Sequence, residues 1–113
     1  MDIVNKIFIT TIKNGGSSIN LEGHSPSKGF MVSTFGNEKK VSLKNFNKKV
    51  IKNYIKKHKK EIKGNFIGTW IDDDVVYLDI SKKEKSKNKA INIAIKNNQL
   101  AIFNLNDFES IYL

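Results

Sequence analysis

The sequence predicts an α+β fold: a mostly antiparallel sheet of five to seven short strands with one long basic helix and one short helix. Two observations lead to this prediction. Short β-branched and aromatic runs, bounded by Gly, Asn and Asp, recur along the chain and indicate strands joined by turns. Residues 43–63 instead repeat apolar side chains every three or four positions, as a helix does. The length of 113 residues predicts a single domain over residues 1–113.

The N-terminal part of the chain predicts strands and turns only. Its β-branched and aromatic runs alternate with segments containing Gly, Asn and Pro. The expected strands are 6–13, 17–21, 29–35 and, briefly, 39–41. The expected turns and loop are 14–16, 22–28 and 36–38.

The clearest expected element is a helix over residues 43–63. Ser42 is a suitable N-cap, because its hydroxyl accepts a free backbone N–H of the first turn. The apolar stripe, which we expect to cover the sheet, contains Leu43, Phe46, Val50, Ile51, Tyr54, Ile55, His58 and Ile62. Gly64 is a natural end for this helix.

A hairpin is expected next, with strands at 65–71 and 75–80 around the turn Asp72-Asp73-Asp74. An even-numbered loop places the aliphatic residues on one face, and these are Ile67, Ile71, Val76, Leu78 and Ile80. The opposite face then carries Phe66, Trp70, Tyr77 and Asp79. An odd-numbered loop mixes the two sets. We favour the even register, because it puts every aliphatic side chain under the helices.

The C-terminal part predicts one helix and two strands. Residues 81–89 form a charged connection, and residues 89–97 form a short helix that ends at Asn97-Asn98. Strands are expected at 100–104 and 110–113.

The charge of the chain is large and unevenly distributed. All 20 basic residues are lysine, against 11 acids, for a formal charge of +9. Residues 43–63 hold nine lysines and one acid, and residues 82–89 hold five lysines. Between them, residues 64–81 hold four aspartates and no lysine. This pattern indicates separate basic and acidic surfaces.

Composition excludes several classes of protein. The absence of cysteine excludes disulfides, thiolate catalysis and cysteine-bound zinc. No catalytic triad, metal-ligand spacing or phosphate-binding loop is recognisable, so we expect neither an enzyme nor a cofactor. No apolar run approaches the roughly 18 residues that a membrane helix needs, and the first residues lack the pattern of a secretory signal. We therefore expect a cytoplasmic protein without membrane contact.

Two sets of residues are candidates for binding a partner. The lysines of the long helix could follow phosphates as point charges, and they are Lys44, Lys48, Lys49, Lys52, Lys56 and Lys60. The hairpin residues Phe66, Trp70, Tyr77 and Asp79 could supply aromatic contacts and a carboxylate. For both sets the simpler interpretation is structural: a solvated helix face, and a strand aspartate paired with a lysine.

The remaining polar residues favour structural roles. We expect His58 to pack or cap the helix and His24 to lie at a loop bend in the segment GHSPSKG. The three aspartates at 72–74 could hold a cation, but a solvated turn is the favoured interpretation.

Five segments together resemble a family of small proteins from bacteriophages, prophages and integrative mobile elements. They are GGSS at 15–18, GFMVS at 29–33, IGTWID at 67–72, VYLDIS at 76–81 and NNQLAIF at 97–103. The resemblance spans residues 15–113 and carries over no catalytic residue. It implies a context in which small accessory proteins often inhibit host defence, anti-CRISPR proteins among them.

These observations lead to three functional hypotheses. The first is a non-enzymatic inhibitor that binds a host nucleoprotein complex, such as an RNA-guided nuclease, through the lysine helix and the aromatic face. The alternative is a general nucleic-acid-binding protein that uses the same residues. A third hypothesis is an enzyme or ligand-binding module centred on Asp79 and the serine loops.

Overall fold

The computed structural model describes residues 2–34 and 36–113, and within them the chain forms seven strands and four α-helices. The strands are β1 (Gly16–Ile19), β2 (Phe30–Ser33), β3 (Lys39–Ser42), β4 (Phe66–Asp72), β5 (Val75–Glu84), β6 (Ala101–Asn104) and β7 (Glu109–Tyr112). The helices are α1 (Ile3–Asn14), α2 (Lys48–Lys57), α3 (Lys59–Ile62) and α4 (Lys87–Lys96), with a 3-10 turn at Leu43–Asn45.

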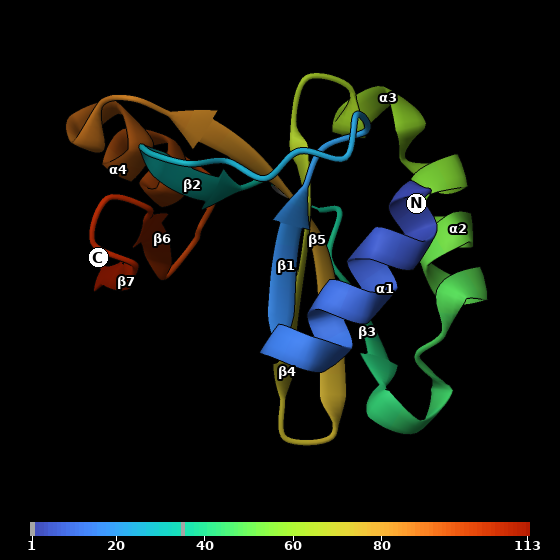
Figure 1. Cartoon of the computed structure of the whole chain (residues 1–113). Coiled ribbons are helices and arrows are strands. Elements are labelled where there is room, and N and C mark those ends of the chain that lie inside the picture. Colours follow the sequence, from blue (N-terminus) through green and yellow to red (C-terminus); the bar gives the residue numbers. More distant parts are fainter. Residues whose placement is uncertain (1, 35) are drawn as a thin grey trace.

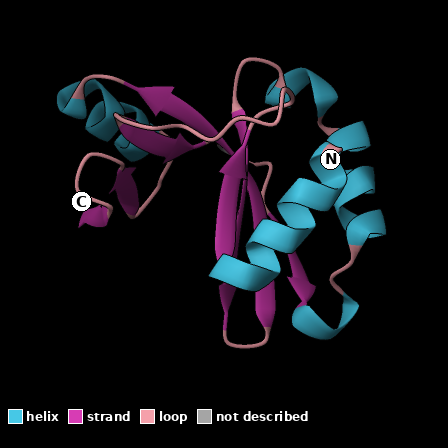
Figure 2. Ribbon diagram, viewed as in Figure 1, coloured by secondary structure: helices cyan, strands magenta, loops and turns pink. Residues whose placement is uncertain are grey.

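All strand pairs are antiparallel, and the order in the sheet is β1-β4-β5-β2-β6-β7. The long strand β5 pairs with β4 on one edge; on its other edge it pairs with β3 and then with β2. Figures 1 and 2 show α1 and α2 together beside β1, β4 and β5, while α4 lies with β2, β6 and β7 at the other end. The predicted α+β class with a mostly antiparallel sheet is confirmed.

The strand predicted at 6–13 is wrong, because this segment is part of helix α1. The side chain of Asp2 caps the helix by accepting a hydrogen bond from the Asn5 N–H (2.9 Å). Gly15 ends it in the left-handed conformation, with φ of 81°. Ile7 and Thr11 are buried four residues apart, so packing of this stripe on the sheet outweighs the strand preference of β-branched residues.

The single helix predicted over 43–63 is divided into three parts. The hydroxyl of Ser42 makes no capping hydrogen bond, and the first turn is a 3-10 turn that ends at Phe46 in extended conformation. Asn47 is the true N-cap of α2, because its side chain accepts from the Val50 N–H (3.0 Å). Phe46 is buried and stacks on Phe8 of α1, so the break places this ring in the core. Gly64, with φ of 80°, follows α3 as predicted.

The hairpin has the predicted even register. Asp72 pairs with Val75, so Asp73 and Asp74 form a two-residue loop. Ile67 pairs with Ile80 and Thr69 with Leu78 on one face, while Trp70 pairs with Tyr77 on the other. The aliphatic face therefore lies under the helices and the aromatic face points away from them.

The charged connection predicted at 81–89 is wrong in its first half. β5 continues to Glu84, where it pairs with Phe30 of β2. Glu84 is buried and forms ion pairs with Lys82 (3.6 Å) and Lys89 (3.8 Å). These ion pairs account for the charged residues inside this strand. The helix predicted at 89–97 is present as α4, which begins two residues earlier, at Lys87.

The other predicted strands are present as short strands β1, β2, β3, β6 and β7. Their predicted ranges are 17–21, 29–34, 39–41, 100–104 and 110–113. The last position of the strand predicted at 29–35, Phe35, lies outside the described residues.

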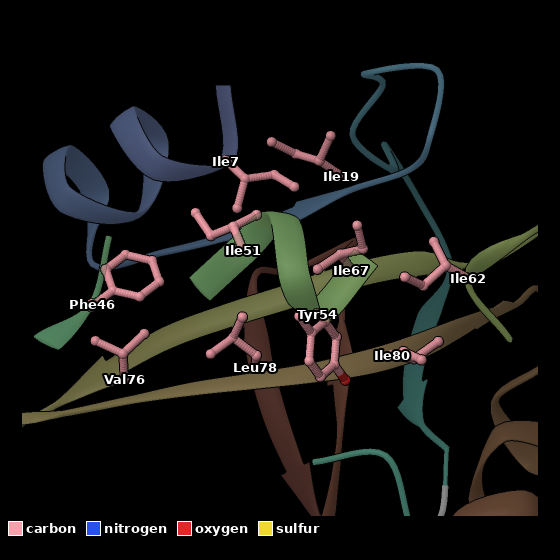
Figure 3. Packing of buried hydrophobic residues seen from close by; sticks show 10 residues of the cluster. All are labelled: Ile7, Ile19, Phe46, Ile51, Tyr54, Ile62, Ile67, Val76, Leu78 and Ile80. Carbon is pink, nitrogen blue, oxygen red and sulfur yellow. The ribbon is translucent and has the colours of Figure 1, made fainter. Parts of the chain in front are cut away.

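Two apolar clusters hold the sheet to its helices. The larger one joins α1, α2, β4 and β5, and Figure 3 shows its side chains meeting between the helices and the sheet. Its members are Ile7, Ile19, Phe46, Ile51, Tyr54, Ile62, Ile67, Val76, Leu78 and Ile80. The smaller cluster packs α4 on β2 and β6 through Phe30, Val32, Ala90, Ala94 and Ile102. One continuous sheet therefore has two cores.

Replacing Gly29 with alanine is expected to destabilise the protein by about 2–3 kcal/mol. Gly29 has φ of +103°, and a Cβ there would lie 2.8 Å from the backbone oxygen of Glu84. Its carbonyl also accepts from the Leu105 N–H (2.9 Å), so the strain falls where β2 meets β5 and β6, beside the smaller core. Gly23→Ala is the matched control, because Gly23 has φ of +84° with open space around it. It should cost about 1 kcal/mol. If urea unfolding showed the same loss of free energy of unfolding for both variants, this prediction would be contradicted.

Candidate functional site

Four lysines of α2 line one groove together with the start of α1. Lys48, Lys49, Lys52 and Lys56 form one wall, and residues 2–5 at the N-terminal end of α1 form the other. The groove has a volume of about 740 Å³ and is open to solvent. Figure 1 shows the N-terminal end of α1 lying against α2, which is what creates it. Phe8 of α1 lies next to Lys48, whose ammonium group is 6.0 Å from the centroid of the Phe8 ring.

Three of these lysines do not stabilise their own helix, whereas Lys56 lies in its last turn, where the helix dipole favours a cation. Among residues 2–34 and 36–113, the ion pairs are Lys82–Glu84 and Lys89–Glu84, and neither involves a lysine of α2. The first turn of α2 contains no acidic residue and begins with Lys48 and Lys49, at the positive end of the helix dipole. Lys48, Lys52 and Lys56 also follow one another at spacings of four, which places like charges side by side. One acid, Asp2, also lines the groove, where its carboxylate caps α1, so the four lysines leave a net positive charge that no ion pair among the described residues compensates.

The other two predicted lysines lie outside the groove. Lys44 is in the 3-10 turn before α2, and Lys60 is in α3; both are exposed. They extend the basic surface along the chain at either end of α2, but they do not line the groove. The predicted lysine set thus consists of a cluster of four and two flanking residues.

The predicted aromatic face is present on the other side of the sheet. The rings of Trp70 and Tyr77 stack with centroids 4.8 Å apart and planes inclined by 19°. The Lys40 ammonium lies 5.5 Å from the centroid of the Tyr77 ring. Phe66 shares this face but pairs with Ser81, and Gly68 separates it from Trp70. The structure therefore brings two of the three predicted aromatic residues into contact.

Asp79 lies next to this aromatic pair and is held by serines. Its two carboxylate oxygens accept hydrogen bonds from the Ser33 hydroxyl (2.8 Å) and the Ser81 hydroxyl (3.2 Å). It lies across from Gly68, where an added Cβ would collide with the Asp79 Oδ1. Gly68 thus provides the space that the carboxyl group occupies. The pairing with a lysine that the simpler interpretation predicts is absent among the described residues.

The stability of the protein is expected to fall as the pH rises through the titration of Asp79. Burial raises the pKa of its carboxyl above the ordinary 3.8, although the hydrogen bonds from Ser33 and Ser81 act in the opposite direction. The folded protein therefore binds more protons than the unfolded chain above pH 3.8, and it loses this advantage as the carboxyl ionises. Asp79→Asn should flatten the pH dependence of urea unfolding measured from about pH 4 upward. If the free energy of unfolding changed with pH in the same way for both proteins, the pH dependence would not come from Asp79.

The remaining candidates have the structural roles expected of them. His58 stacks on Tyr54 (4.6 Å between ring centroids) at the C-terminal end of α2. The backbone N–H of His24 donates to the Asn20 side chain (2.9 Å) in an exposed loop. The aspartates at 72–74 are exposed at the hairpin turn. Within residues 2–34 and 36–113, His and acidic side chains form no group of three or more that could hold a metal ion.

The two candidate surfaces face in different directions. α2 packs on the aliphatic side of β4 and β5, so its outward lysines and the Trp70 face lie on opposite sides of the sheet. Sequence reasoning missed the second wall of the groove, because it assigned residues 6–13 to a strand. The spacing of Ile3, Ile7 and Thr11, with Asp2 before them and Gly15 after them, is the signal that indicates α1.

Searches against protein-family models, curated proteins and solved structures found no match in any of the three. In the part of the chain that the structure describes, no helix has both the length and the apolar character to span a membrane.

Proposed function

We propose that this protein is a non-catalytic binding protein that docks on a host nucleoprotein complex and inhibits it by contacting the phosphate backbone of its nucleic acid. The lysine groove, defined as Lys48, Lys49, Lys52 and Lys56 with residues 2–5, makes this contact. The setting is the mobile-element context that the sequence resemblance implies. In that setting, a small anti-CRISPR-type inhibitor needs binding surfaces rather than catalytic groups.

The observation that carries this proposal is the excess positive charge of the groove, in which four lysines face one acid, Asp2. Lysines that stabilise a helix lie near its C-terminal end or beside acids, and of the four only Lys56 does so, in the last turn of α2. Lys48 and Lys49 instead occupy the first turn of the helix, and no acid in residues 2–34 or 36–113 forms an ion pair with them. A row of phosphates would supply the missing counter-charge.

The chemistry of the groove favours backbone contact over base recognition. The sequence contains no arginine, the residue that pairs most often with guanine edges. Lysine contributes a point charge that follows phosphates without reading sequence. Recognition of one particular target therefore has to come from a second surface, and the exposed Trp70, stacked on the half-buried Tyr77, provides one on the other side of the sheet.

The proposal is tested by binding generic RNA and DNA to the protein over a range of salt concentrations. If each of the four lysines neutralises one phosphate, log K should fall against log salt with a slope of about −3.6 for duplex DNA, since each contact contributes about −0.9. A slope near zero, or no binding to nucleic acid or to a nucleoprotein, would remove the basis for the proposal.

A pull-down of the tagged protein from a bacterial host, with and without nuclease, separates the inhibitor from its alternative. Recovery of one defined nucleoprotein complex supports inhibition of a specific target. Recovery of mixed RNA or DNA that nuclease treatment abolishes supports the alternative, a general nucleic-acid-binding protein. The groove supports that alternative as well, because lysine contacts to phosphate are independent of sequence.

A further inference from the structure

The indole of Trp70 has one side free on the open face of the sheet. Trp70 is 49% exposed, and Tyr77 stacks on one side of its ring. On the other side, its partner in β1 is Gly16, which has no side chain to cover the ring. α1 and α2 pack on the opposite face of the sheet. The free side of the indole is therefore available to a flat or cationic group.

The charges around this ring are mainly negative, although the whole protein is strongly basic. Asp72 follows Trp70 by two residues in β4 and so shares its face, and Asp73 and Asp74 form the exposed turn beyond it. Asp79 lies on the same face, but the Ser33 and Ser81 hydroxyls hold its carboxyl and burial raises its pKa, so the open negative charge comes from the turn. Among the described residues, these four aspartates take part in no ion pair. The nearest cation to the aromatic pair is Lys40, on the Tyr77 side.

We propose that this open face binds an arginine side chain of a basic protein partner, with its guanidinium over the free side of Trp70 and hydrogen-bonded to the Asp72–Asp74 turn. A guanidinium is planar, stacks on aromatic rings and matches carboxylate oxygens with two parallel donors. The inference rests on the proposed function. It goes further by naming the chemistry of the protein component in the complex. The same aspartates repel phosphates, so the charge on this face favours a protein over a nucleic-acid strand.

The single tryptophan of the chain makes the test direct. Trp70 is the only tryptophan, so its fluorescence reports on this face alone. The probe is a synthetic peptide of alternating glycine and arginine, titrated into the full-length protein. Saturable quenching of the Trp70 emission is expected, with affinity about fivefold weaker for the matching lysine peptide.

The double variant Asp72→Asn/Asp74→Asn should bind the arginine peptide about fivefold more weakly than the original protein. Asp73 stays unchanged, because its φ of 54° makes the turn sensitive to substitution. The matched control is Glu22→Gln/Glu61→Gln, which removes the same charge at two exposed positions away from this face and should bind as the original protein does.

Three outcomes would overturn the inference. The first is an absence of saturable quenching by the arginine peptide, and the second is equal affinity in the two double variants. The third is quenching by a single-stranded oligonucleotide that becomes stronger in Asp72→Asn/Asp74→Asn, which would make a nucleobase the occupant. Failure of the proposed function would instead appear in the salt-dependent binding of nucleic acid to the lysine groove. That measurement does not use Trp70 fluorescence, so the two failures can be told apart.

Discussion

Reversing two charges in the lysine groove, with Lys48→Glu and Lys52→Glu combined, is expected to weaken binding to generic RNA or DNA about 100-fold. Each lysine within about 4 Å of a phosphate contributes about 1 kcal/mol in water, and a glutamate replaces that attraction by repulsion. Screening by salt reduces the total binding free energy lost at the two sites to about 2.7 kcal/mol, which corresponds to the 100-fold loss of affinity. Fluorescence anisotropy with a labelled oligonucleotide at fixed salt measures the effect, and the salt slope should fall by about half.

The same variant should keep or improve its stability, which separates lost binding from lost folding. A glutamate at Lys48 would lie in the first turn of α2, where the helix dipole favours a negative charge. The matched control is Lys85→Glu/Lys87→Glu, which makes an identical change of charge at exposed positions at the start of α4 and before it. If both double variants lose affinity equally, net charge drives binding and the groove has no particular role.

Local patterns were sufficient to predict the hairpin and both of its faces. Side chains alternate strictly along β4 and β5, and the aspartate turn between them allows a loop of even length. Only that register places Ile67, Leu78 and Ile80 together in the core. The positions of Trp70 and Tyr77 followed from the same argument, because a two-residue period fixes both faces at once.

One wall of the groove was missed, because the local strand preference of residues 6–13 competes with the helix signals at Asp2 and Gly15. Residues 6–13 are β-branched and aromatic, and by local preference they indicate a strand. They become helical because Ile7 and Thr11 pack on the sheet, where the Thr11 hydroxyl meets the Thr69 hydroxyl at 2.6 Å. That contact joins residues far apart in the chain and has no local signature.

The surroundings of Asp79 likewise required the strand order. Ser33 comes from β2 and Gly68 from β4, and both reach Asp79 only because β5 lies between those strands. The sequence singled out Asp79 as a polar residue inside a strand. Nothing near it in the sequence identifies Ser33 as its hydrogen-bond donor.

Replacing Leu78 with alanine is expected to lower the free energy of unfolding by about 3 kcal/mol. Leu78 is fully buried in the middle of β5, opposite Thr69, and packs in the larger core between the helices and the sheet. Truncation removes three carbon atoms from a site that the neighbouring strands β3 and β4 hold in place, so the cavity is expected to persist. Urea unfolding followed by Trp70 fluorescence measures the loss.

The matched control is Leu100→Ala, the same truncation at a side chain that is 83% exposed, and its effect should stay within about 0.5 kcal/mol. Where Leu78→Ala remains folded, its affinity for nucleic acid should lie within about twofold of the original, because the groove lysines point away from this core. A larger loss of affinity would mean that the groove depends on the packing beneath it. The charge of α2 would then be only part of what positions a phosphate backbone.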